Sequence, residues 1–148
     1  MTRQLRKEKD MNLKETGQLF YQLKLANQEL TAKFEAETGF NITRFELMHI
    51  LIEHAPCTQS FIQHELKIDS AAVTRHLKVL EEKAYVTRER NKDNHREIFV
   101  NITETAIKEM TSCEDTHQKE QTLDLSLTKE EEGTLMELLT KIVKMKEE

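Results

Sequence analysis

The chain has few of the residues that break helices or build disulfide frameworks. Its 148 residues include three glycines, one proline, two cysteines and no tryptophan. Few helix breakers favour a mostly helical fold, and two cysteines are too few for a disulfide-stapled domain. No apolar run approaches the roughly 20 residues of a membrane-spanning helix, and no apolar segment follows the basic residues of the first ten positions. We therefore expect a cytoplasmic protein without a secretory signal or a membrane partner.

Sequence motifs for catalysis are missing as well. The chain has no P-loop, no GxGxxG and no nucleophile–base signature, so we predict neither an enzyme nor a bound cofactor. Cys113 and His117 are four residues apart in a predicted helix and could share a metal ion. Because no second His/Cys pair accompanies them, an interior cysteine and a partly exposed histidine are favoured, and we predict no metal site.

The distribution of charge is more informative than the total of −5. Residues 70–100 contain seven Lys/Arg and five Asp/Glu, a net charge of +2, whereas residues 1–69 carry −1 and residues 101–148 carry −6. Local charge decides whether a surface attracts phosphates. The central segment is therefore the candidate for an anionic partner.

The first half of the chain shows helical periodicity. Apolar residues spaced three and four apart predict an amphipathic helix over residues 12–37. A capping box of Thr43 and Glu46 is expected to open a second, largely buried helix that ends before Pro56. A short helix over 58–66 follows.

The second half adds a hairpin between helices. Asp69 and Ser70 offer N-capping oxygens to a helix over 71–83. Segments 85–90 and 97–102 alternate in polarity and flank a turn-prone linker, which predicts a β-hairpin. Two further helices are expected, over 103–121 and 128–145.

The fold class that follows is mainly α with a small β-hairpin wing. We predict a single domain over residues 1–148, with a winged helix-turn-helix lobe at 42–102. The helices over 11–38 and 103–148 are expected to form a dimerisation region.

The helix-turn-helix segment suggests a surface that reads DNA. Val73, Leu77 and Leu80 share one face of the 71–83 helix and can pack inward. The opposite face is small, hydroxylated or basic, as close contact with base edges requires; its members are Ser70, Ala71, Thr74, Arg75 and Lys78. The hairpin adds basic residues suited to a minor groove; these are Arg88, Arg90, Lys92, His95 and Arg96.

These residues resemble the MarR family of bacterial transcription regulators. The match lies in Ala71-Ala-Val-Thr-Arg-His-Leu-Lys-Val-Leu-Glu-Glu-Lys-Ala-Tyr-Val-Thr-Arg and continues through Asp93-Asn-His-Arg-Glu-Ile-Phe-Val-Asn-Ile-Thr103. Ala84 and Ala106 stand where the family commonly has glycine, and the wing has the spacing Asp93-x-x-Arg96 instead of adjacent Asp-Arg-Arg. The resemblance implies a homodimer formed by the terminal helices, and a repressor that binds a pseudo-palindromic operator.

The resemblance also implies a small aromatic or amphipathic effector, bound between the dimer helices and the DNA-binding lobe. Residues that could face such a cleft are Phe34, Phe45, His49 and Met110. Plain core packing is the alternative, and it is the favoured one.

Two other groups of residues carry weaker signals. His49 and His54 are five residues apart, a spacing that favours separate structural roles over shared ligation. Cys57 lies beside Pro56 in a predicted loop without a basic neighbour, which disfavours a redox switch.

A protein–protein adaptor remains the alternative function. Its wing would not need arginine and lysine, and its recognition face would be apolar or acidic. The observed residues favour duplex DNA as the partner.

Overall fold

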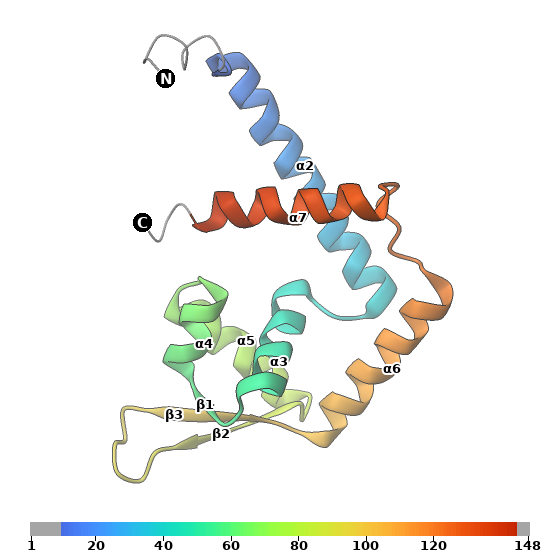
Figure 1. The fold of residues 1–148 in the computed structure, drawn as a ribbon. Coiled ribbons are helices and arrows are strands. Elements are labelled where there is room, and N and C mark those ends of the chain that lie inside the picture. Colours follow the sequence, from blue (N-terminus) through green and yellow to red (C-terminus); the bar gives the residue numbers. More distant parts are fainter. Residues whose placement is uncertain (1–9, 145–148) are drawn as a thin grey trace.

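The structure is a computed structural model that describes residues 10–144 (Figure 1). The compact part is a lobe of three helices on a small antiparallel sheet. Its helices are α3 (Ile42–His54), α4 (Gln59–Leu66) and α5 (Ser70–Glu82). The strands are β1 (Cys57–Thr58), β2 (Val86–Arg90) and β3 (Ile98–Ile102), in the order β1-β3-β2. Outside the lobe run α2 (Leu13–Thr38), α6 (Glu104–Glu120) and α7 (Lys129–Lys144).

The helices agree with the predicted ranges because their ends carry strong local signals. Gly39 ends α2 in a left-handed conformation, with φ +78°. Asp69 caps α5, since its carboxylate accepts a 2.7 Å hydrogen bond from the backbone N–H of Ala72. Thr58 and Thr103 cap α4 and α6 in the same way. The predicted end of the last helix, Met145, lies outside the described residues.

The predicted capping box at the start of α3 is wrong. The N-cap is Asn41, whose side-chain oxygen accepts from the backbone N–H groups of Thr43 and Arg44 at 3.0 and 3.1 Å. Asparagine is at least as good an N-cap as threonine. Gly39 reverses the chain only two residues earlier, so the helix begins sooner than the sequence pattern indicated.

The predicted loop around Cys57 is also wrong, because Cys57 lies in β1. It pairs with Val100 of β3, and 8% of its surface is exposed. Burial raises the pKa of the Cys57 thiol and so disfavours the reactive thiolate. A two-residue strand paired with a segment more than 40 residues later leaves no periodic signal in the sequence.

The hydrophobic core lies where α3, α4 and α5 meet the sheet. Leu47, Leu51, Ile62, Leu77 and Val100 are fully buried there. The prediction that α3 is largely buried is confirmed for Leu47, Met48, Ile50 and Leu51, although Ile52 is 44% exposed.

The three outer helices bury little. Neither α2 nor α7 has a buried residue among those described, and α6 buries only Ala106 and Met110. Large apolar side chains therefore remain exposed along these helices; they include Leu19, Phe20, Leu30, Met136, Leu138 and Ile142. Among residues 10–144, no helix is long and apolar enough to cross a membrane.

Candidate nucleic-acid interface

The helix α5 separates an apolar from a polar face as the sequence predicts. Val73, Leu77 and Leu80 are buried, with exposed fractions of 1, 0 and 2%. Every α5 residue predicted to face DNA is exposed; these are Ser70, Ala71, Thr74, Arg75 and Lys78. The Thr74 hydroxyl donates to the backbone oxygen of Ser70 at 3.0 Å, which leaves its oxygen able to accept from a partner. This face presents small and basic groups at the helix-turn-helix surface.

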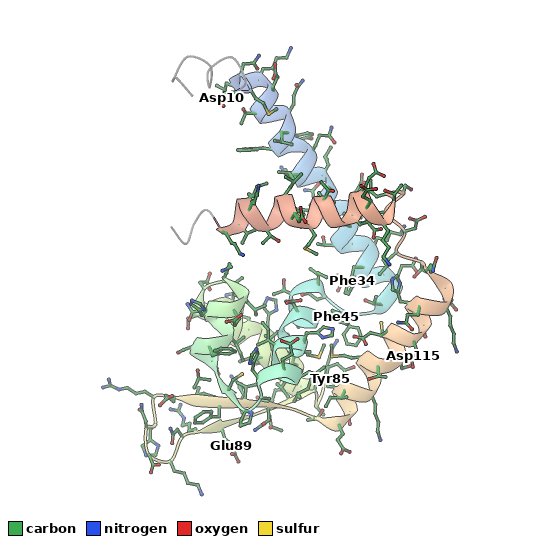
Figure 2. All side chains as sticks on the ribbon, viewed as in Figure 1. Asp10, Phe34, Phe45, Tyr85, Glu89 and Asp115 are labelled. Atoms are coloured by element: carbon green, nitrogen blue, oxygen red, sulfur yellow. The ribbon has the colours of Figure 1, made fainter. Side chains whose placement is uncertain are left out.

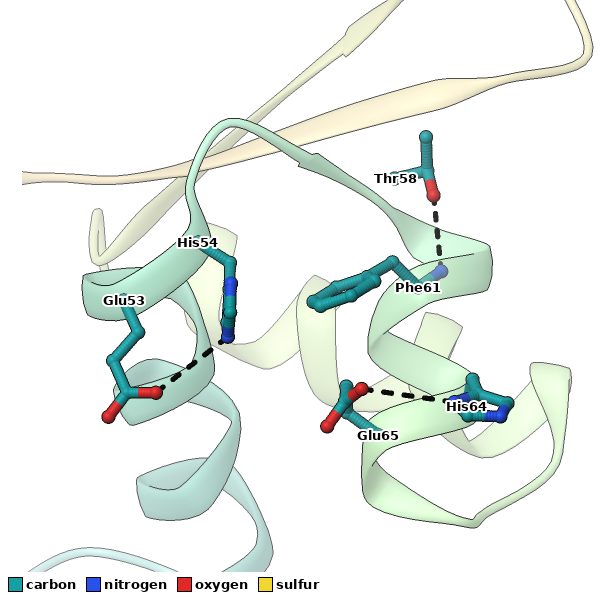
Figure 3. Close-up of polar contacts among 6 residues, drawn as sticks. All are labelled: Glu53, His54, Thr58, Phe61, His64 and Glu65. Atoms are coloured by element: carbon teal, nitrogen blue, oxygen red, sulfur yellow. Dashed lines mark hydrogen bonds and ion pairs between the residues drawn. The ribbon is translucent and has the colours of Figure 1, made fainter.

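The turn before α5 holds the two helices of the motif together. Lys67 takes a left-handed conformation with φ 57° and ends α4. Phe61, in the first turn of α4, donates its backbone N–H to the Thr58 hydroxyl, and its ring lies 5.0 Å from that of His54 (Figure 3). His54 also approaches Glu53 at 3.7 Å, so it is a surface residue with local partners. The motif is therefore held by caps and packing, and α5 keeps its polar face free.

The hairpin of β2 and β3 projects past the helices as a wing (Figure 1). Arg90 closes its neck by donating from Nη1 to the backbone oxygen of His95 at 2.9 Å. The side-chain oxygens of Asn91 and Asn94 accept from the backbone N–H groups of Asp93 and Arg96. Such asparagine turns preorganise the loop.

The basic residues of the wing fall into two groups. Arg90 is exposed at the neck of the hairpin, and Lys92, His95 and Arg96 are exposed in the loop. Arg88 is only 23% exposed and pairs with Glu81 of α5 at 3.0 Å. Hydrogen bonds from Arg88 lower the pKa of the Glu81 carboxyl. Arg88 therefore ties the wing to the end of α5, a structural role that the sequence did not reveal.

One further contact on α5 was missed from the sequence. Arg44 of α3 approaches Nδ1 of His76 at 3.4 Å. Burial, followed by the nearby charges of Arg44 and Arg75, lowers the pKa of His76. The imidazole therefore stays neutral beside two arginines and adds no positive charge to α5 near neutral pH. A contact across 32 residues has no local signal in the sequence.

Three of the four predicted effector residues form one aromatic row. The ring of Phe45 lies 5.1 Å from that of Phe34 and 4.7 Å from that of His49. Figure 2 shows Phe34 on α2 above Phe45 on α3. His49 also reaches Glu114 of α6 at 3.3 Å. Met110 is separate from this row, since it is 1% exposed within the core of the lobe.

Two hollows lie where α2 and α6 meet the lobe. One, of about 310 Å³, has an apolar wall that includes Phe34, Phe45 and Leu123. The other, of about 470 Å³, is lined by Tyr85 and Glu109 among other residues. Cys113 and His117 line both hollows. No cluster of three or more metal-ligating side chains occurs within residues 10–144.

These features define a winged helix-turn-helix lobe carried on long outer helices. Residues 40–98 match the model of the MarR family. The chain is 42% identical over 90 residues to "Uncharacterized HTH-type transcriptional regulator YdgJ" of Bacillus subtilis, covering 61% of this chain and 55% of that protein. It is 27% identical over 96 residues to the organic hydroperoxide resistance transcriptional regulator of the same organism, covering 63% and 65%.

Solved structures share the fold over most of the chain. A mutant MarR from E. coli, complexed with operator DNA, has a TM-score of 0.75 at 24% identity and covers 89% of this chain and 99% of that one. The repressor CouR, bound to a DNA duplex, has a TM-score of 0.77 at 18% identity, covering 90% and 99%. The central lobe of the chain is therefore similar to the MarR family. It spans a little over half the length of the first relative.

Proposed function

We propose that this protein is a sequence-specific transcription regulator that binds double-stranded DNA. The observation that carries the proposal is the exposed polar and basic face of α5, opposite its buried stripe. A helix of this kind fits the major groove, where small residues allow close approach and Arg75 can donate to a guanine. The exposed wing residues Lys92, His95 and Arg96 suit an adjacent minor groove.

The functional unit is a homodimer on a pseudo-palindromic operator. The apolar side chains exposed on α2 and α7 supply a surface that a second copy would bury. In this proposal the winged lobe is 42–102 and the dimerisation region comprises 11–38 and 103–148, all within one domain. Two α5 helices, about one DNA turn apart, would then read the two half-sites. Repression follows because a dimer bound to the operator blocks transcription.

A small aromatic or amphipathic effector fits the hollow beside Phe34 and Phe45. Its wall is mostly apolar, and His117 and Glu114 contribute polar groups to the lining. Because α2 and α6 both line this hollow, an occupant would alter how the dimerisation helices meet the lobe. The cytoplasmic location and the absence of catalysis stay predictions.

Selection from random duplexes tests the DNA-binding proposal most directly. We expect recovery of a two-half-site sequence, bound with an affinity that falls steeply as salt concentration rises, because phosphate contacts release counterions. An adaptor for other proteins would recover no sequence and show no salt slope. Either of those results with a folded protein would refute the proposed function.

A further inference from the structure

The helices α5 and α6 meet at a joint formed by three residues. Ala84 and Tyr85 follow α5, and Thr103 precedes α6. The Thr103 hydroxyl donates to the backbone oxygen of Ala84 at 2.8 Å, and its N–H donates to the oxygen of Tyr85 at 3.0 Å. The same hydroxyl accepts from the N–H of Ala106, 3.3 Å away. Thr103 thus caps the start of α6 and is hydrogen-bonded to the segment that follows α5.

The side chain of Tyr85 adds a second connection across this joint. Its hydroxyl donates to the carboxylate of Glu109 on α6. The ring packs against Phe40 at 6.4 Å between centroids. The backbone N–H of Tyr85 also donates to the oxygen of Leu80 in α5 at 2.9 Å. Tyr85, labelled in Figure 2, therefore contacts both the last turns of α5 and the second turn of α6.

The buried contacts between α6 and the lobe leave one movement of this helix, its tilt, for other contacts to restrict. The only buried residues of α6 are Ala106 and Met110, four apart and so on one stripe. Both residues lie in the first two turns of α6, so the rest of the helix can tilt about this buried part. Glu109 lies off this stripe. Its contact with Tyr85 and the contact between Glu114 and His49 resist such a tilt.

A small change at the joint has a large effect at the far end of α6. The helix has 17 residues, which corresponds to a length of about 26 Å. A tilt of roughly 10° would displace its far end by about 4–5 Å, more than the roughly 3.4 Å between successive base pairs. In a dimer held by the outer helices, such a tilt changes the separation of the two α5 helices.

We infer that Tyr85 is a positioning residue for DNA recognition, which fixes the separation of the two α5 helices through its hydrogen bond to Glu109. The inference rests on the proposed function, because a separation matters only to a dimer that reads two half-sites. Tyr85 itself need not contact DNA. Its effect is on which spacing of half-sites the dimer accepts.

The test is a set of operator duplexes in which the half-site spacing changes one base pair at a time. The parent should prefer one spacing by about tenfold over its neighbours, since the cost of deforming DNA grows with the mismatch. Tyr85→Phe and Glu109→Leu should reduce that preference to roughly threefold or less. Glu109→Gln should preserve it, because the amide oxygen still accepts from the phenol.

The control for Glu109→Leu is Asp115→Leu, which removes an exposed carboxylate farther along α6 and should leave the spacing preference unchanged. Thermal unfolding of each variant is measured in parallel. Tyr85→Phe keeps the ring against Phe40 and loses only the hydroxyl, so it carries the test if Glu109→Leu does not fold.

The outcomes separate this inference from the proposed function. A parent that prefers one spacing, with Tyr85→Phe and Glu109→Leu variants that prefer it equally, refutes the positioning role and leaves DNA binding intact. Equal weakening at every spacing also refutes it, because a merely structural role produces that result. A parent that binds no duplex removes the proposed function, and the inference with it.

Discussion

Two alanines stand where the resemblance to the MarR family implies glycine, and the structure distinguishes them. Ala84 takes a left-handed conformation with φ 61°, in which a β-carbon is strained. Ala106 lies in helix α6 and is 1% exposed. Replacement of alanine by glycine would therefore relieve backbone strain at Ala84 and remove a buried methyl group at Ala106.

We expect Ala84→Gly to stabilise the protein by about 0.5–1 kcal/mol, since relief of left-handed strain exceeds the added entropy of the unfolded chain. Ala106→Gly should destabilise it by about 1 kcal/mol or more, through lower helix propensity and a lost buried methyl group. Urea unfolding of both variants gives the measurement. Shifts of the same sign would contradict the backbone assignment at Ala84.

The phenol of Tyr85 should ionise only at high pH, because its hydrogen bond to Glu109 and its burial raise its pKa to about 12. The folded-state pKa lies above the ordinary value of 10.0. The hydrogen bond therefore stabilises the fold fully below the ordinary pKa, and this stabilisation is lost as pH rises through about 12.

The chain has two tyrosines, so a Tyr21→Phe background isolates Tyr85. We expect its tyrosinate absorbance to develop with a midpoint near 12, and Glu109→Leu to lower that midpoint. Circular dichroism, recorded alongside, identifies the range in which the protein is folded. A midpoint unaffected by Glu109→Leu would show that the hydrogen bond does not form in solution.

At the scale of single elements, α5 and the wing offer separate contributions to DNA binding. Arg75 and Lys78 both lie on the exposed face of α5, but a guanidinium can read a guanine through two hydrogen bonds, whereas an ammonium suits a phosphate. The wing ends in exposed residues and is tied to α5 through Arg88.

Replacing Arg75 with alanine should weaken binding to the selected operator by about 1–3 kcal/mol and relax specificity at one position. Lys78→Ala should weaken all duplexes alike and flatten the salt dependence. Titrations against operator and random duplex at several salt concentrations distinguish these effects. Operator affinity that is unchanged in the Arg75 variant would remove its proposed role.

For the wing, we expect Arg96→Ala to lower DNA affinity by about 1 kcal/mol or more, and most strongly at sites with A·T-rich flanks, where the minor groove is narrow and negative. Thermal stability should be unchanged, because the side chain is exposed. Arg88→Ala is the contrasting variant: it breaks the pair with Glu81 and should lower stability as well. Binding isotherms on operators that differ only in their flanks, with thermal unfolding, test both. Normal binding by Arg96→Ala on every operator would make the wing a structural element only.

The sequence predicts these elements well where the signal is local. The cap Asp69 and the alternating strands around the asparagine turn depend on near neighbours, and their ranges are confirmed within two residues. The features that the sequence did not predict depend on contacts between residues far apart in the chain. The partner of Cys57 in β3 and the contact between Arg44 and His76 arise only when separate segments fold together. Phe34 and Phe45, named from the sequence as possible cleft residues, lie together in an aromatic row that the sequence did not predict, whereas Met110 belongs to the core.

At the scale of the whole molecule, the distribution of charge and exposed apolar surface suits a dimer on DNA. The basic segment 70–100 contains α5 and the wing, whereas the acidic segment 101–148 contains α6 and α7. In the proposed dimer, α7 contributes an apolar stripe that is exposed in the single chain. Leu138 and Ile142, four residues apart on that stripe, are 52% and 53% exposed.

Replacing both Leu138 and Ile142 with glutamate should therefore dissociate the dimer. Burial of each side chain contributes about 1.5–3 kcal/mol, and two buried carboxylates add a desolvation penalty. Neither residue belongs to the core of the lobe, so the lobe should stay folded. Light scattering gives the mass, and circular dichroism gives the helix content. Thr140→Glu with Lys144→Gln is the control, since it changes the net charge equally on the opposite face of α7.

Deletion of Leu135–Glu148 removes the same apolar stripe and should likewise abolish the dimer or the fold. A folded double-glutamate variant with the parent's dimeric mass would place the dimer contact elsewhere, because α7 could not then bury this stripe against a second copy.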